Sequence, residues 1–236
     1  MRHLDPLQAL SGIPCLRSFP PQALEAIAES ARLRAFRPRE RMWAPGDPLP
    51  GTYLVVSGLV WAYLDATHTG DSLVSTLWSG DLLEPYPGKL REWATYGVAV
   101  SPVVQAALPP DAFHAVSAHD PTLARRILSD LAYRWHRQNH WDVDLRLVSL
   151  KQRLLLLFRR MADELGTATQ EGVLLDFPLT YEIVAGLACV KRDHAGRKLQ
   201  ELTREGYLTK RPRFRWLVPD PDRLGQPICL PPVAHP

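Results

Sequence analysis

The sequence predicts an α+β protein: an N-terminal antiparallel β sandwich or roll, then one long helix, then a C-terminal winged helix-turn-helix. Three observations support this prediction. Between residues 32 and 108, short strand-like runs alternate with Gly, Pro and Asp turns at roughly ten-residue spacing. Residues 120–147 contain no Gly, and no Pro after Pro121. Residues 179–208 hold two apolar patterns of helical spacing with a short break between them.

The N-terminal part begins with a helical pattern over residues 20–33, and Pro20 and Pro21 mark its start. One face of this helix carries the apolar residues Leu24, Ile27, Ala28 and Ala31. The strand-like runs then follow at 32–36, 40–44, 52–56, 59–64, 74–78, 96–100 and 103–108. Turns are indicated by PGD at 45–47, SG at 57–58 and SGD at 79–81.

Residues 120–147 are expected to form a single long amphipathic helix. Gln138 and Asp142 share a seam with apolar residues that recur at three- and four-residue steps, namely Leu128, Leu131, Trp135 and Leu145. Such a helix either packs on the preceding β domain or pairs with a copy of itself. Polar residues in an apolar seam can fix the register of a pair, so we favour a parallel dimer helix.

A second helical pattern starts at Ser149, where Ser149 and Gln152 have the spacing of a capping box, and it ends at Gly166. The break before Ser149 is therefore the expected domain boundary. Residues 167–178 include the strand-like VLLDF. The helix-turn-helix follows, with Thr180 as the expected N-cap of its first helix and Gly206 as the C-terminal cap of its second. The expected buried positions are Val184, Leu187, Ala188, Ala195, Leu199 and Leu202.

The second helix of this pair carries Arg192, Asp193, Gly196 and Arg197 on a different face from its apolar residues. A donor-rich face near the start of a helix is suited to reading base edges in the major groove of DNA. An ordinary two-helix hairpin with a solvated charged face has the same local pattern, so the rest of the chain must decide between these two interpretations.

After Gly206, the run YLTKRPRFRWLVPD alternates basic and apolar residues around Pro212. It predicts a two-stranded wing with Arg213 and Arg215 on one face and Phe214 and Trp216 on the other. The tail from Pro219 has six prolines in 18 residues, and we expect it to be irregular or loosely docked.

Charge is concentrated near the C-terminus. Residues 191–215 hold nine Lys or Arg and three Asp or Glu, a balance of +6, so the rest of the chain carries −3 against a total of +3. This distribution suggests a polyanionic partner for that module alone. The three cysteines have no metal, redox or disulfide spacing, and Asp5, Pro6 and Gln8 interrupt any signal-peptide pattern. With no apolar run long enough to span a membrane, these features fit a cytoplasmic protein.

The order of these elements resembles the CRP/FNR family of bacterial transcription regulators. The resemblance extends from about Leu10 to Val218 and rests on the segments PGD (45–47), TYLVVSGLV (52–60), SGDLL (79–83), DPTLARRIL (120–128), QRLLLL (152–157) and EIVAGLACVKRDHAGRKLQEL (182–202). It implies a β-roll like a cyclic-nucleotide-binding jelly roll over 1–119, a dimerisation helix over 120–147, a winged helix-turn-helix over 148–218 and a Pro-rich tail over 219–236.

The resemblance also implies that the protein is a homodimeric, sequence-specific DNA-binding regulator, with RNA polymerase as a partner, and that it is not an enzyme. Arg192, Asp193 and Arg197 match the family's three base-reading positions, which are Arg, Glu and Arg in the best-known members. Arg suits guanine O6 and N7, and a carboxylate can accept from cytosine N4. We therefore expect TGTGA-like half-sites in an inverted repeat, with centres roughly 10–10.5 bp apart.

The expected phosphate contacts are Thr180, Lys191, Arg211, Arg213 and Arg215. The sequence departs from the family pattern at two positions of the helix-turn-helix. Cys189 stands where the turn usually has Gly, and Lys191 stands where Ser or Thr usually caps the second helix.

The residues that clamp the cyclic phosphate in cyclic-AMP-binding members are not matched. Trp93 and Ala94 align with the family's Arg-Ser pair and Asp81 with its Glu, while Arg91 lies two residues from the Arg position. An indole supplies neither the charge nor the donor fork of a guanidinium, so we expect no dependence on cyclic AMP. Gln138 and Asn139, at positions that meet the base in nucleotide-binding members, could contact another small ligand or each other across a dimer.

No cofactor is expected. Only Cys15 lies in the region where the iron–sulfur members have a cysteine cluster. His136 and His140 have i, i+4 spacing but no third metal ligand in view, and nothing supports haem binding at His68. No nucleophile–base pair, metal triad or phosphate loop has the spacing of an enzyme site. The aromatic residues of the roll are expected to fill its core: Trp61, Tyr63, Trp78, Trp93 and Tyr96.

Overall fold

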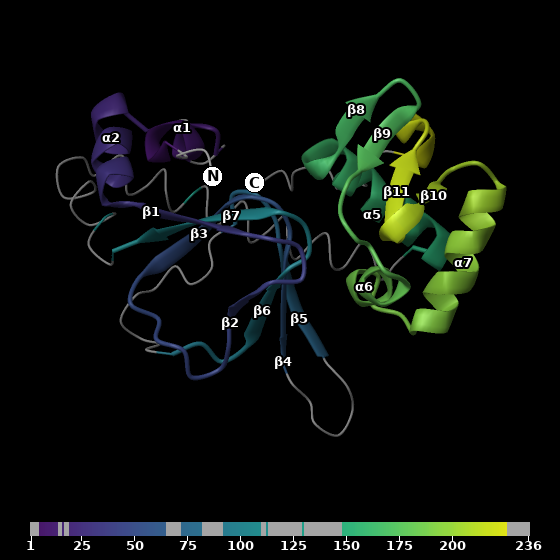
Figure 1. Ribbon diagram of the computed structural model, residues 1–236, viewed down its shortest axis with the longest axis horizontal. Coiled ribbons are helices and arrows are strands. Elements are labelled where there is room, and N and C mark those ends of the chain that lie inside the picture. The colour runs from purple at the N-terminus through teal and green to yellow at the C-terminus, as the bar shows by residue number, and fades with distance from the viewer. Residues whose placement is uncertain are drawn as a thin grey trace, which may run out of the picture. The chain divides into compact units, whose positions relative to one another are not determined.

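The computed structural model describes residues 5–13, 16, 19–64, 72–81, 92–109, 112, 129 and 148–225. The chain divides into two compact units, Met1–Tyr133 and Arg134–Pro236 (Figure 1). Within the described ranges, no helix is both long enough and apolar enough to cross a membrane.

The first unit contains two antiparallel sheets. β1 (Arg32–Phe36), β3 (Thr52–Ser57) and β7 (Val103–Leu108) form a three-stranded sheet in the order β1-β7-β3. The second sheet has the order β2-β6-β4-β5, with β2 (Arg41–Trp43), β4 (Val60–Leu64), β5 (Ser72–Leu77) and β6 (Tyr96–Ala99). All seven strands overlap the runs predicted from sequence, and every pairing is antiparallel, which confirms the predicted roll.

Two helices cover the three-stranded sheet, α1 (Pro6–Ser11) and α2 (Pro21–Ser30) (Figure 1). Leu10 of α1 and Ile27 of α2 are buried in one cluster with Leu54 and Leu108 of the sheet. The helix predicted over 20–33 ends at Ser30, because Ala31 is already extended and β1 begins at once. The sequence reading did not include α1, although it has a strong start signal: Asp5 accepts a hydrogen bond from the Leu7 N–H, and Pro6 occupies the first turn.

The space between the two sheets is filled by aromatic and branched side chains. Trp43 and Trp93 stack with ring centroids 4.4 Å apart, and Tyr53 lies 5.6 Å from Trp93. Phe36, Val55 and other buried residues complete this cluster.

Of the five aromatic residues expected in the core, Trp78 and Trp93 are buried. The expectation was wrong for the other three, Trp61, Tyr63 and Tyr96, which are only half-buried. Trp61 and Tyr63 alternate along β4 with the buried Val60 and Ala62 and so lie on its other face.

Two of the predicted turns are closed by aspartate side chains and left-handed glycines. Asp47 accepts from the Ala44 N–H and Asp81 from the Trp78 N–H, at 2.7 and 2.8 Å. Gly46 and Gly80 precede these aspartates with φ of 84° and 86°, a conformation that strongly favours glycine. The PGD and SGD segments are therefore turn-forming motifs.

The second unit is built on α5 (Leu150–Leu165), whose capping box between Ser149 and Gln152 forms as predicted. Its other elements are β8 (Thr167–Thr169), β9 (Gly172–Leu175), α6 (Tyr181–Leu187), α7 (Arg192–Arg204), β10 (Thr209–Arg211), η1 (Pro212–Phe214), β11 (Arg215–Val218) and η2 (Pro221–Leu224). The strands form one antiparallel sheet in the order β10-β11-β9-β8. The wing is thus one half of a four-stranded sheet rather than an isolated hairpin.

Two sequence predictions in this unit were wrong. Phe214 and Trp216 do not share a face: Phe214 is 40% exposed and Trp216 only 1%. The strict alternation fails because Arg213 and Phe214 lie in the turn η1, both with positive φ. The tail is also better ordered at its start than expected, since Leu224 of η2 is buried and Arg159 of α5 pairs with Asp222 at 2.8 Å.

The predicted dimer helix lies outside the described residues except for Ser129, which is helical. Its seam therefore stays a prediction, as do the assignments for Gln138, Asn139, His136 and His140. Arg91, His68, Cys15 and the tail beyond Gly225 also lie outside the described ranges. The expected domain bounds 1–119, 120–147, 148–218 and 219–236 remain predictions as well.

Candidate nucleic-acid interface

α6 begins and ends on well-formed caps. The Thr180 hydroxyl accepts from the Ile183 N–H at 3.3 Å, as predicted. At the other end, the Cys189 N–H bonds to the Gly186 carbonyl and the Val190 N–H to the Ala185 carbonyl, which is a Schellman motif. Cys189 occupies its left-handed position with φ 53°, where glycine is usually found. The turn between the helices therefore forms despite an unfavourable residue.

α5 supports this turn directly. The Arg153 guanidinium donates from Nη1 to the Ala188 carbonyl at 2.8 Å, the carbonyl at the end of α6. Ala188 itself is fully buried. The contact satisfies a carbonyl that the helix leaves without a partner of its own.

α7 presents one buried face and one exposed face, as the sequence predicts. Ala195, Leu199 and Leu202 are fully buried. The exposed residues include the three candidate base readers and continue to the last turn: Arg192, Asp193, Arg197, Gln200 and Arg204. The candidate readers all lie in the first two turns of a helix whose opposite face is fixed in the core. Their side chains are consequently exposed on the side of the helix that faces away from the core.

Gly196, which the sequence places on a different face from the apolar residues of α7, lies between the exposed and the buried face of the helix. It is half-buried, and a Cβ built there would lie 3.8 Å from Cδ2 of Tyr181. Tyr181, at the first position of α6, thus packs beneath the first turns of α7. Sequence reasoning did not single out Tyr181. The signal that could have identified it is its position, as an aromatic residue directly after the N-cap Thr180.

The two ends of α7 differ in how well they are capped. Lys191 stands at the N-cap, where the family usually has Ser or Thr, and its side chain makes no capping hydrogen bond. At the C-terminus, the Tyr207 N–H bonds to the Leu202 carbonyl and Gly206 has φ 76°, which completes the predicted glycine cap. Near this end a hydrogen bond from Lys198 lowers the pKa of Glu201, so that this carboxylate stays charged.

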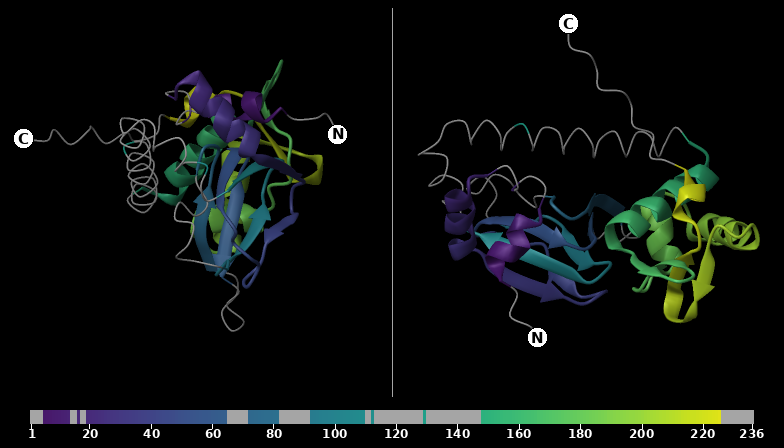
Figure 2. Two further views of the ribbon diagram at one scale, coloured as in Figure 1. Left: turned by 90° about the vertical axis from the view of Figure 1, so that its left-hand side faces the viewer. Right: turned by 90° about the horizontal axis from the view of Figure 1, so that it is seen from above.

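The wing projects from the helices of its unit as the yellow β10–β11 hairpin in Figure 2. Arg211 and Arg215 lie directly opposite each other on its two strands. Each is paired with an acid from the neighbouring hairpin: Arg211 with Glu171, and Arg215 with Asp176 at 2.8 Å. Two of the three wing arginines expected at phosphates are therefore engaged within the protein.

A second group of contacts joins the wing to α6. The Lys210 ammonium donates to the Tyr181 hydroxyl at 3.1 Å and lies 4.6 Å from the centroid of that ring. Phe214 meets Tyr181 edge-on, with centroids 6.2 Å apart. The Leu179 N–H donates to the Phe214 carbonyl at 2.8 Å, and the buried Trp216 indole donates to the Leu179 carbonyl at 3.0 Å. The wing is thus attached to the start of α6 through both backbone and side chains.

The two described residues of the candidate effector pocket lie in the roll and have structural partners. Trp93 is 9% exposed and stacks on Trp43 in the core. The Asp81 carboxylate accepts from the Trp78 N–H within its own turn. Neither side chain is arranged as an anion clamp. The other candidates, Arg91, Gln138 and Asn139, lie outside the described residues.

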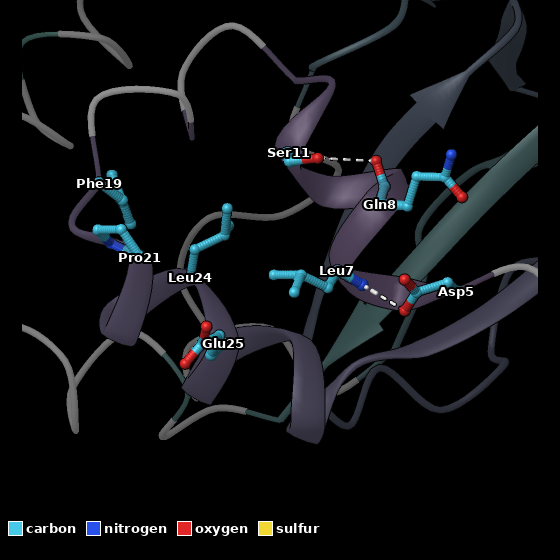
Figure 3. Close-up of a pocket in the computed structure, with 8 residues that line it drawn as sticks. All are labelled: Asp5, Leu7, Gln8, Ser11, Phe19, Pro21, Leu24 and Glu25. Atoms are coloured by element: carbon cyan, nitrogen blue, oxygen red, sulfur yellow. Dashed lines mark hydrogen bonds between the residues drawn. The ribbon is translucent and has the colours of Figure 1, made fainter.

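A separate hollow lies between α1 and α2 (Figure 3). Leu7 and Leu24 point into the space between the two helices, and Asp5 and Glu25 are among the residues that line it (Figure 3). Its charged groups are acidic, which is unsuited to a polyanion. The described residues contain no cluster of His, Cys, Asp or Glu that could hold a metal ion.

The comparisons with known proteins agree with this geometry. Residues 151–226 match the model of the Crp-like helix-turn-helix domain. The CRP-like cAMP-activated global transcriptional regulator of Mycobacterium tuberculosis is 22% identical over 227 residues, covering 94% of this chain and 99% of that protein.

Solved structures share the fold. A CRP-family transcriptional regulator from Thermus thermophilus has a TM-score of 0.65 at 20% identity, covering 81% of this chain and 94% of that one. The c-di-GMP-responsive global regulator CLP of Xanthomonas campestris has a TM-score of 0.63 at 18% identity, covering 84% and 99%. A roll, a helix-turn-helix with an exposed Arg-Asp-Arg set and a basic wing thus occur together with these matches. Residues 151–226 form a Crp-like helix-turn-helix domain, and the chain as a whole is similar to transcription regulators of the CRP family.

Proposed function

We propose that this regulator acts as a homodimer on an inverted repeat of TGTGA-like half-sites, without cyclic AMP. The observation that carries the proposal is the exposed set Arg192, Asp193 and Arg197 on the first two turns of α7. Arg192 and Arg197 are suited to bidentate bonds with guanine, and Asp193 accepts from cytosine N4. Asp is one methylene shorter than the Glu of the best-known family members. Of the three base contacts, the one between Asp193 and cytosine should therefore discriminate least between bases.

The phosphate contacts are assigned to residues around these readers. The Thr180 hydroxyl accepts from Ile183 and keeps its own proton for a phosphate oxygen. Lys191, exposed and free of a capping bond, supplies a positive charge at the start of α7. Arg213 is exposed at the wing tip, whereas Arg211 and Arg215 must exchange their acidic partners for phosphate. Such contacts orient the protein without selecting sequence.

Independence from cyclic AMP is supported by the roll interior. The indole of Trp93 stacks on Trp43 in the core, and an indole offers no charge to a cyclic phosphate. The alternative is a sensor that binds another small molecule between the roll and the dimer helix. RNA polymerase is proposed as the partner that converts DNA binding into regulation.

The decisive experiment is selection of bound sites from random DNA by the purified protein with no ligand added. We expect enrichment of an inverted repeat with TGTGA-like half-sites. Binding to the selected site should be unchanged when cyclic AMP is added. Absence of enrichment, restored by a cell extract, would favour the ligand-dependent sensor.

Variants then test the readers one by one. Arg192→Ala and Arg197→Ala should each cost about 1–3 kcal/mol and relax preference at one base pair. Arg204→Ala is the matched control, because Arg204 is an exposed arginine on the same helix but in its last turn. If Arg192→Ala weakens all sequences equally, the base-reading assignment is wrong.

A further inference from the structure

At the tip of the wing, the backbone adopts a conformation that residues other than glycine disfavour. Arg213 (φ 59°, ψ 34°) and Phe214 (φ 58°) both lie in the left-handed region, and neither is glycine. Residues with a Cβ avoid this conformation unless surrounding contacts impose it, and such strain is concentrated at functional sites. The Leu179 N–H donates a hydrogen bond to the Phe214 carbonyl and so ties this turn to the start of α6.

This backbone turns the Phe214 side chain outward. Among the described residues, Phe214 and Leu64 are the large hydrophobic side chains that are exposed, at 40% and 46%, and Leu64 belongs to the other unit. The Phe214 ring is not free to move, since Tyr181 meets it edge-on and the Lys210 ammonium lies 4.9 Å from its centroid. The tip therefore presents a fixed aromatic edge to its surroundings.

Positive charge flanks this ring. Lys210 stands on one side, and the neighbouring Arg213 is exposed with no ion pair among the residues that the structure describes. Arg211 and Arg215, by contrast, have acidic partners. An exposed apolar ring that contacts a lysine and is followed along the surface by an exposed arginine next to it in the chain fits a polyanion that also offers apolar surface, as the sugars and base edges of DNA do.

The tip is also connected to the candidate base-reading helix. Phe214 contacts Tyr181, and Tyr181 packs against Gly196, the residue before Arg197. The tip is thus linked to the helix of Arg197 through Tyr181, close enough to reach the duplex beside the major groove that Arg197 is proposed to read.

We propose that the wing tip enters the minor groove next to the half-site, with Phe214 against the sugars and base edges and Arg213 at the phosphates that border the groove. This inference rests on the proposed major-groove reading by α7. Apolar wedges in the minor groove part base steps that deform easily, and arginines favour narrow A·T-rich grooves. Phe214 and Arg213 thereby set a preference for the sequence that flanks each half-site.

The test uses the full-length protein and duplexes with identical half-sites but flanks that are either A·T-rich with a TA step or G·C-rich. The wild-type protein is expected to bind the A·T-rich duplex more tightly, by about fivefold or more in fluorescence anisotropy, the lower range for one aromatic contact with DNA. Phe214→Gly removes the ring but accepts the left-handed backbone without strain. It should abolish most of the flank preference, and Phe214→Leu should keep part of it.

Controls separate this role from simple wing stability. Leu64→Ser removes the other exposed hydrophobic side chain and should leave the flank preference unchanged. Thermal melting of Phe214→Gly establishes that the variant is folded. A folded variant that keeps the wild-type flank preference overturns the inference. Failure of the wild-type protein to bind any TGTGA palindrome would overturn the proposed function instead, before the flanks are compared.

Discussion

Cys189 shows how one side chain limits the stability of the helix-turn-helix. It occupies the left-handed position of a Schellman motif, where Cβ meets the following carbonyl. We predict that Cys189→Gly raises the unfolding free energy of the second unit by about 1 kcal/mol, because glycine adopts this conformation without a steric penalty. Urea unfolding followed by circular dichroism measures the change as a higher midpoint of the second unit's transition at an unchanged slope.

Cys189→Ser is the matched variant, since it replaces the sulfur and keeps the Cβ. It should bring no comparable gain. Equal midpoints for the glycine and serine variants would show that the backbone at position 189 carries no strain. DNA affinity should be unchanged in both variants, because residue 189 is not among the candidate contacts.

At the scale of the element, acidic side chains beside β9 are proposed to compete with DNA for the arginines of the wing. Glu171 and Asp176 hold Arg211 and Arg215, which are proposed to meet phosphates. We predict that Glu171→Gln with Asp176→Asn raises affinity about two- to tenfold for every DNA sequence, because exposed ion pairs are weak and a nearby acid repels phosphate. Anisotropy titrations on the selected operator and on an unrelated duplex measure both effects.

The ratio of the two affinities should stay constant, since phosphate contacts carry no sequence information. Glu164→Gln is the control: Glu164 pairs with Arg160 within α5, away from the wing. A change in specificity rather than in overall affinity would mean that these acids act on the base-reading residues.

The elements also show where sequence reasoning succeeds and where it stops. Local signals located the seven strands of the roll, the capping box at Ser149 and the two-sided character of α7, because each depends on residues within one or two turns. The ion pair of Arg211 with Glu171 joins residues 40 positions apart, and no local pattern contains it. The outward turn of Phe214 was missed for the same reason, since a hydrogen bond ties it to Leu179.

For the site, the sequence identified the residues of α7 but not what surrounds them. The positions of Arg192, Asp193 and Arg197 follow from helical geometry, and the exposure of all three agrees with it. Tyr181 connects the wing to α7 only through tertiary contacts. Likewise, α1 was overlooked because Pro6 was taken as an interruption rather than as the first residue of a helix.

For the whole molecule, the proposed homodimer makes a prediction about the spacing of its half-sites. Two readers related by twofold symmetry need half-site centres about one helical turn apart. Inserting about 5 bp between the half-sites turns the second one to the opposite side of the duplex. Affinity should then fall by about 100-fold, since only one reader can engage. A companion duplex carries an insertion of a full turn, about 10 bp, which returns the second half-site to its original side of the duplex.

The oligomeric state of the purified protein tests the homodimer directly. Native mass spectrometry at micromolar protein should give a mass about twice the 26.6 kDa of one chain. A monomer mass, together with equal binding to all spacings, would contradict the dimer and leave each helix-turn-helix acting alone.

The capping box at Ser149 and the docking of η2 have a consequence for how this regulator can be built from parts. Ser149 and Gln152 fix the start of α5 with their own side chains, and Arg159 of the same helix holds Asp222 near the other end of the described segment. Both ends of the reading module are therefore secured on one helix. Such a module is suited to exchange: it can be joined to a different preceding domain at residue 148 while its own first and last turns stay intact.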